Sequence, residues 1–132
     1  MTDLRKVSTH TFYSTPTASQ LAAVKALAGP GDEWAAAARR RYAEIGAAAA
    51  ERLGVEPPKG STFLFLDVAD QLEEDGLLGF LERCADHGLL LAPGPSFGPY
   101  PHHARLCFTA APPEVTARGV ERLAALLGRS SS

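Results

Sequence analysis

Hydrophobic residues recur at helical spacing in four stretches of the chain. The pattern predicts a helix over about residues 16–28, a long alanine-rich helix over 33–53, a third between Asp75 and Gly88, and a last one that opens at Pro112 and Pro113. Asp32 and Asp75 are expected to cap the second and third helices, and Gly54 and Gly88 to follow their last turns. The apolar stripes are Leu77, Leu78, Leu81 and Cys84 in the third helix and Val120, Leu123, Ala124 and Leu127 in the last.

Runs of β-branched, aromatic and leucine residues between these helices predict the strands. Residues 62–68 are expected to form a largely buried strand, and residues 89–91 and 105–108 two shorter ones. The proline- and glycine-rich stretch 93–101 is expected to be a loop. The first residues lead into a β-branched and aromatic stretch at 8–13, for which we expect an extended connector.

The resulting order is helix, helix, strand, helix, strand, strand, helix, which predicts an α+β fold. In this fold a long linking helix precedes a small sheet covered by helices. Residues 1–31 would form a connector and a helix, and residues 32–132 the long helix and the small domain. At about 1.5 Å per residue the long helix would extend about 30 Å, enough to join two lobes.

Composition narrows the class of protein. The chain has 132 residues, 45% of them hydrophobic and 21% charged, which suits a compact domain with its own core. A formal net charge of -2 provides no field that would attract a nucleic acid, so no nucleic-acid partner is expected. No apolar run approaches the roughly 20 residues that span a bilayer, so we expect no membrane association and a cytoplasmic location.

Among residues that could carry chemistry, Arg105 stands out. It opens a predicted strand after a glycine- and proline-rich loop, where its planar guanidinium could hold a carboxylate through two hydrogen bonds. The alternative is a strand-end arginine paired with a surface acid. Other polar groups have simpler explanations: His102 and His103 point to opposite sides of an extended segment, residues 39–41 form a solvated helix face, and residues 73–75 place negative charge at a helix start. No metal site is expected.

The two cysteines, Cys84 and Cys107, lie in a predicted helix and a predicted strand. They are not arranged as CxxC, and no cluster of histidines surrounds them. We expect two buried thiols rather than a disulfide or a pair of ligands.

Four segments of the chain, at residues 13–20, 58–67, 88–98 and 104–108, together resemble the carboxy-terminal part of class I/II (fold type I) pyridoxal-phosphate-dependent aminotransferases. Residues 13–20 (YSTPTASQ) resemble the stretch just after the cofactor lysine. Residues 58–67 (PKGSTFLFLD) resemble the P-x-G-T-F-F entry into the small domain. Residues 88–98 (GLLLAPGPSFG) are similar to G-V-x-V-x-P-G-x-x-F-G, and residues 104–108 (ARLCF) to h-x-R-L-x-F. The four follow in the family's order over nearly the whole chain.

The resemblance implies a role for particular residues. Arg105 would clamp the α-carboxylate of an amino-acid or 2-oxo acid substrate, and Phe97 and Gly98 would belong to a loop at the substrate entrance. The helix over residues 32–53 would bridge the end of the large domain and the small domain. The activity implied is amino-group transfer between an amino acid and a 2-oxo acid.

The chain departs from the family at the cofactor site. The family needs a lysine that forms a Schiff base with pyridoxal phosphate, whereas Lys6, Lys25 and Lys59 all lack the S-K-x-x-x-x-G-x-R surroundings of that residue. No catalytic or cofactor-binding residue is therefore expected in this chain, and the isolated chain is expected to hold no pyridoxal phosphate.

Two interpretations follow. The chain is either a small-domain portion that is active only with a polypeptide supplying the cofactor-binding domain, or a non-catalytic binding module derived from one. A truncated or decayed copy of an enzyme is a further alternative. The helix over residues 16–28 is also expected to self-associate or to fray, because its stripe of Leu21, Val24 and Ala28 would have no partner in the lone chain.

Overall fold

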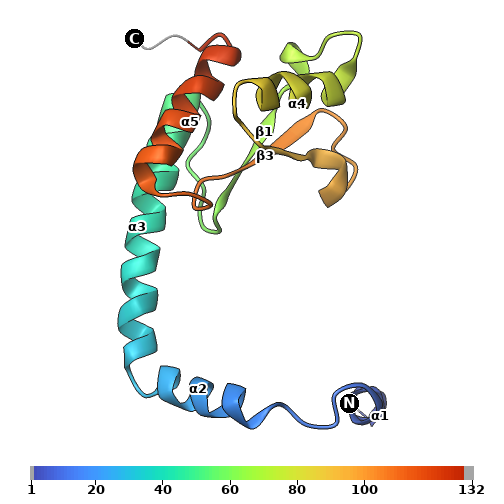
Figure 1. Ribbon diagram of the computed structural model, residues 1–132, viewed down its shortest axis with the longest axis vertical. Helices are drawn as coiled ribbons and strands as arrows, with labels where there is room; N and C mark the ends of the chain where they lie inside the picture. The colour runs from blue at the N-terminus through green and yellow to red at the C-terminus, as the bar shows by residue number, and fades with distance from the viewer. Residues whose placement is uncertain (1, 130–132) are drawn as a thin grey trace. The chain divides into compact units, whose positions relative to one another are not determined.

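The computed structural model describes residues 2–129, and over these residues the protein has the predicted α+β fold. Five α-helices and a three-stranded antiparallel sheet make up the described chain (Figure 1). Two short 3-10 helices, η1 and η2, interrupt the loops. The elements are α1 (Thr2–Thr11), α2 (Thr17–Leu27), α3 (Pro30–Leu53), β1 (Phe63–Asp67), η1 (Ala69–Gln71), α4 (Gly76–Asp86), β2 (Ala92–Pro93), η2 (Gly94–Phe97), β3 (His103–Cys107) and α5 (Pro113–Leu126).

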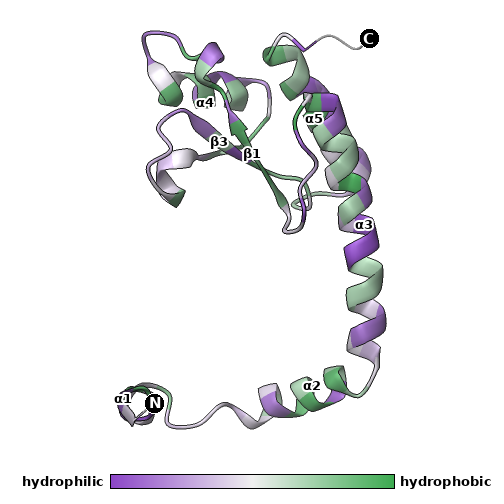
Figure 2. Ribbon diagram, turned by 180° about the vertical axis from the view of Figure 1, so that it is seen from behind, coloured by the Kyte–Doolittle hydropathy of each residue, from purple (hydrophilic) through white to green (hydrophobic). Residues whose placement is uncertain are grey.

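The chain divides into two units, the first ending at Arg39 and the second beginning at Arg40. Helix α3 runs through the boundary. No residue of α1 or α2 is buried, although α2 is largely hydrophobic (Figure 2). Every residue of the hydrophobic core belongs to the second unit, which therefore contains all the burial that stabilises the described chain.

Helix α1 replaces the extended connector expected at the start of the chain. Its threonines are compatible with a helix because their hydroxyl groups bond to the preceding turn. Thr9 donates to the carbonyl of Arg5 and Thr11 to that of Val7, each at 2.8 Å. The helix ends before Tyr13, which has a φ of 56°. The predicted extended connector was therefore wrong. β-Branching restricts the side chain of a threonine, but it does not prevent a helix in which the hydroxyl group gains a hydrogen bond.

The predicted helix ends at Gly54 and Gly88 are confirmed. Both glycines have positive φ, at 61° and 72°, and both close a Schellman motif. After Gly88, the amide of Leu89 donates to the carbonyl of Cys84 at 2.9 Å. This bond holds Leu89 in the helix cap, so the strand expected at residues 89–91 is wrong in position. The strand forms three residues later, at Ala92.

The helix starts differ from prediction in detail. Helix α3 begins at Pro30, so Asp32 lies within its first turn instead of capping it. Asp75 precedes α4 as expected but makes no capping hydrogen bond, because its carboxylate binds Arg83. Leu78, predicted to be buried, is 67% exposed, and Phe80 is buried in its place.

The sheet has the order β1-β3-β2, with both pairs antiparallel. Leu64 and Leu66 of β1 are buried, whereas Phe63 and Phe65 are exposed, so the strand expected to be largely buried is buried on one face only. In register with β1, Ala104 of β3 stands opposite Leu66 and is fully buried. One face of the sheet therefore belongs to the core, and the other faces away from it.

The core combines the carboxy-terminal half of α3, the inner face of the sheet, α4 and α5. The stripe predicted for the last helix is buried throughout, at Val120, Leu123, Ala124 and Leu127. Phe108, directly after β3, is its largest fully buried side chain. The ring of Phe108 packs against α3 at Gly46, which has no side chain to obstruct it. A Cβ atom built at Gly46 would lie 2.9 Å from Cζ of Phe108.

This close approach predicts opposite effects for two helical glycines. Gly46→Ala should destabilise the protein by about 1 to 3 kcal/mol, because the added methyl group must displace the ring of Phe108. Gly119→Ala on α5 should instead stabilise it by roughly 0.5 to 1 kcal/mol, since the new Cβ would make only an ordinary contact, 3.6 Å from Leu89. Chemical denaturation of both variants measures the difference. A stabilised Gly46→Ala variant would show that the ring has room to move.

The uneven burial predicts an uneven response to hydrogen exchange. Amide protons of α2 should exchange at least about 100-fold faster than those of α5, because no buried side chain holds α2 in place. Exchange monitored by NMR or mass spectrometry at several protein concentrations measures this. Equal protection of α2 and α5 in the monomer would contradict it, whereas protection that rises with concentration would reveal self-association through α2.

Candidate functional site

The face of the sheet that is turned away from the core carries Arg105. Alternation along the strands places Phe63 and Phe65 of β1 and His103 and Arg105 of β3 on this outer face, and Phe65 stands directly opposite Arg105 in the register. The segment after β2 adds two further rings, those of Phe97 and Tyr100, which contact Phe65. The outer face is thus an aromatic surface with one arginine among the rings.

The guanidinium of Arg105 lies over two of these rings. Its Cζ is 4.2 Å from the centroid of Phe63 and 4.1 Å from that of Phe97. Both distances are within the range of a cation–π interaction, in which the negative face of a ring attracts the cation. With rings at both contacts, the hydrogen-bonding edge of the guanidinium is the part left for a ligand.

Arg105 has no polar partner within residues 2–129. Its Nε is buried without a hydrogen bond, and no carboxylate of the described chain forms an ion pair with it. The two terminal nitrogens are not among the buried unsatisfied atoms, so they reach solvent. This argues against the alternative of a strand-end arginine paired with a surface acid.

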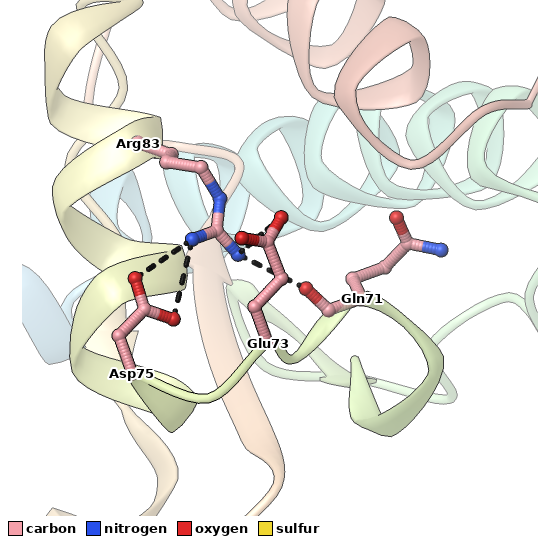
Figure 3. Close-up of polar contacts among 4 residues, drawn as sticks. All are labelled: Gln71, Glu73, Asp75 and Arg83. Carbon is pink, nitrogen blue, oxygen red and sulfur yellow. Dashed lines mark hydrogen bonds and ion pairs between the residues drawn. The ribbon is translucent and has the colours of Figure 1, made fainter.

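Two other half-buried arginines show what a structural role looks like in this protein. Arg83 binds the carboxylate of Asp75 at 3.0 Å and the carbonyl of Gln71 at 3.1 Å, and Glu73 lies 3.7 Å away (Figure 3). These contacts tie α4 to the segment before it. Arg52 of α3 bonds Glu121 of α5 at 2.8 Å in the same way. Arg105 differs from both because no carboxylate or carbonyl of the described chain binds its guanidinium.

The aromatic rings around Arg105 hold each other in place. Phe65 is the centre: its ring lies 5.0 Å from Tyr100, 6.3 Å from Phe97 and 4.9 Å from His103, between centroids. The first two pairs meet edge to face and the third is stacked. A hollow of about 370 Å³ lies beside these rings, and it is lined by Ser61, Phe63, Phe65, Phe97, Tyr100 and Arg105.

The structure brings together some of the residues named from the sequence. Phe97, the last residue of η2, lies against Arg105, and Gly98 follows it with a φ of 140°. Phe63, Phe65 and Tyr100 were not named. The alternation of Phe and Leu over residues 63–66 was the available signal, but its outward face could not be identified without the register of β1 on β3.

The structure also places the other polar candidates named from the sequence. The three arginines at 39–41 are all exposed, as predicted. Between residues 2 and 129 no group of three or more His, Cys, Asp or Glu side chains is placed to hold a metal ion. No helix among these residues is both long enough and apolar enough to cross a membrane.

The two cysteines are free thiols in different environments. Cys84 is buried as expected, and burial raises its pKa despite the nearby charge of Arg83. Cys107 is only half-buried, which corrects the prediction of two buried thiols. Its partial burial acts to raise the pKa, but hydrogen bonds with Thr109 and Thr62 and the charge of Arg105 outweigh it, and the pKa of Cys107 lies below the ordinary value.

The residues of this chain do not fit a pyridoxal phosphate site. Lys6 and Lys25 lie on α1 and α2, outside the unit that contains the hollow, and Lys59 lies in an exposed turn. None of the three is among the residues that line the hollow. A covalent attachment of the cofactor beside Arg105 would therefore need a lysine from elsewhere.

Comparison of the chain with models of protein families, with curated proteins and with solved structures finds no match. Function is therefore inferred from the geometry around Arg105 and from the sequence motifs.

The position of Arg105 predicts the reactivity of Cys107. Iodoacetamide should alkylate Cys107 much faster than Cys84, and Arg105→Met should move the pH profile of this reaction to higher pH. The sign follows because the positive charge stabilises the thiolate, so removing it raises the thiol pKa. Mass spectrometry of the alkylated chain over a pH series gives both rates.

Arg118→Met is the matched control for that experiment, because Arg118 is exposed on α5 and forms no ion pair within residues 2–129. A pH profile that is the same in the Arg105→Met variant as in the unmodified chain would show that the guanidinium does not influence the thiol, contrary to this prediction.

Proposed function

We propose that this chain is the small-domain portion of a pyridoxal-phosphate-dependent aminotransferase and acts with a polypeptide that supplies the cofactor-binding domain. In this proposal α3 is the linking helix and the second unit is the small domain, as in fold type I enzymes. The reaction is amino-group transfer between an amino acid and a 2-oxo acid. The location expected for such an enzyme is the cytoplasm.

One observation supports the proposal above the others: Arg105 contacts two rings, lies on an open face, and has no carboxylate or hydrogen-bond partner within residues 2–129. Partial burial of an arginine without a counter-ion costs free energy, unless a bound ligand supplies the opposite charge and the missing hydrogen bonds. The resemblance assigns the same residue, on independent grounds, to the substrate carboxylate. Geometry and motif therefore agree on one side chain.

The chain's own contribution to the reaction is to bind and orient. The terminal nitrogens of Arg105 can donate two parallel hydrogen bonds to a carboxylate approaching from the solvent side. The contacts with Phe63 and Phe97 restrict the orientation of the guanidinium, so a bound carboxylate is held in one preferred orientation. Because no lysine of the chain lines the hollow, proton transfer and cofactor attachment are assigned to the other polypeptide.

The outer face of the sheet is the surface that we assign to that polypeptide. Its rings are well exposed, with Phe65 at 40% and Phe97 at 43%. Exposed aromatic rings grouped around an arginine are typical of surfaces that form an interface with another protein.

A stand-alone binding module is the second candidate, and the position of the core favours it. The second unit has a complete hydrophobic core of its own and contains Arg105 with all the rings around it. Such a unit can bind a carboxylate without any second polypeptide.

Capture of partners from the native cell separates the two candidates. With the tagged chain as bait, the first candidate requires a co-purified protein that contains the S-K-x-x-x-x-G-x-R motif, and transaminase activity that appears when the two purified proteins are mixed. A chain that recovers no such protein and shows carboxylate binding alone would support the binding module.

In the active complex, Arg105→Lys should lower kcat/KM by about 30-fold to several thousand-fold. Lysine cannot reproduce two parallel bonds to a carboxylate, and loss of such a contact costs roughly 2 to 5 kcal/mol. Steady-state kinetics with an amino acid as the varied substrate measures the change. Arg118→Lys, on the exposed side of α5, should leave the constants unchanged.

The fold of the Arg105→Lys variant should survive, because its side chain lies outside the hydrophobic core. An Arg105→Lys protein that unfolds, while its folded fraction keeps normal kinetic constants, would make Arg105 a structural residue and end the clamp assignment.

A further inference from the structure

The residues that line the hollow beside Arg105 define which acid it can take. They comprise one cation, four aromatic rings and two hydroxyl groups, those of Ser61 and Tyr100. No second basic side chain and no acidic side chain is among them. A ligand that fills the hollow therefore finds one place for a negative charge and aromatic surface everywhere else.

The packing of the guanidinium fixes how the charged end of the ligand approaches. Rings occupy both cation–π contacts, and Nε is buried, so only the edge formed by the two terminal nitrogens is open. A carboxylate meets this edge end-on, through two hydrogen bonds in the guanidinium plane. Its substituent then extends over the neighbouring aromatic surface.

That surface begins at Phe65, which stands opposite Arg105 in the strand register. The rings of Phe65 and Tyr100 meet edge to face at 5.0 Å and are 40% and 42% exposed. An aryl group on the ligand could cover these rings and add favourable aromatic contacts. A second carboxylate would lose hydration there, and no second basic side chain is among the residues that line the hollow.

We propose that this hollow selects monocarboxylic acids that bear an aromatic group, in preference to dicarboxylic acids. The assignment of these acids as substrates, that is, aromatic amino acids and their 2-oxo acids, rests on the proposed function. The binding preference itself belongs to the second unit, which contains every residue of the hollow.

A ligand series on the full, unmodified chain tests the preference without cofactor or partner. The probes are 3-phenylpropanoate, propanoate, succinate and 3-phenylpropan-1-ol, titrated while NMR follows the Arg105 side chain and the ring protons of Phe65 and Tyr100. We expect 3-phenylpropanoate to bind at least about 10-fold more tightly than each of the other three. Covering one face of a phenyl ring corresponds to a factor of this order.

Two variants assign the two parts of the preference. Arg105→Met should weaken 3-phenylpropanoate at least about 10-fold, whereas Arg118→Met should leave it unchanged. Phe65→Leu keeps an apolar side chain in the strand but removes the ring, and it should weaken 3-phenylpropanoate about 5-fold with no effect on propanoate. Circular dichroism confirms that each variant is folded, and the ligand series in the unmodified chain decides the matter if one is not.

The opposing outcomes differ in what they overturn. Succinate binding as tightly as 3-phenylpropanoate, with both lost in Arg105→Met, would refute the aromatic preference and leave the carboxylate clamp of the proposed function intact. The alcohol binding as tightly as the acid would show that the guanidinium does not recognise a carboxylate. That result would overturn both this inference and the clamp.

Discussion

The register between β1 and β3 is the constraint on which the rest of the structure depends. With Phe65 opposite Arg105 and Leu66 opposite Ala104, the small and aliphatic side chains of these pairs face the helices, and the aromatic ring and the arginine face outward. A shift of one residue in β3 would turn Arg105 into the core and expose Ala104, whereas a shift in β1 would turn Phe65 inward and expose Leu66. Burying an unpaired guanidinium would cost several kcal/mol, so the charge of Arg105 itself helps to exclude the alternative register.

The same constraint explains why the arginines of this protein differ. Arg52 and Arg83 lie where helices approach other segments, and acids on those segments neutralise them. Arg105 lies on a strand whose neighbours across the sheet are aromatic, so rings take the place of a counter-ion. A ring attracts a cation through its quadrupole but accepts no strong hydrogen bond in the plane of the guanidinium. The hydrogen-bonding capacity of Arg105 is therefore left for another molecule.

Features that depend on a local signal in the sequence could be predicted, whereas features that depend on contacts between distant segments could not. This holds for the fold and for the candidate site. Gly54 and Gly88 end helices as predicted, because tolerance of positive φ is a property of the residue itself, whereas Asp75 fails as a cap because Arg83 takes its carboxylate. Arg105 could likewise be named from its motif and its place after a loop. The site residues of β1 could not be named in this way. The face that β1 turns outward depends on the packing of its leucines against helices that are distant in sequence. The aromatic character of the hollow, and with it the inferred ligand class, is therefore a result of tertiary structure.

Exposure of the outer face also sets a limit on what Arg105 can do in the lone chain. On the open face, solvent screens the ion pair between a guanidinium and a carboxylate, so the pair contributes only part of the binding free energy that it would contribute in a closed site. The same pair becomes much stronger when the site is closed and water is excluded. On the proposed function, a cofactor-bearing polypeptide that covers the rings of Phe65 and Phe97 would supply this closure. One chain would then provide the arginine that binds the carboxylate, and the other would exclude water from the site. This gives a physical reason why an arginine in contact with two rings lies on the exposed face of the sheet.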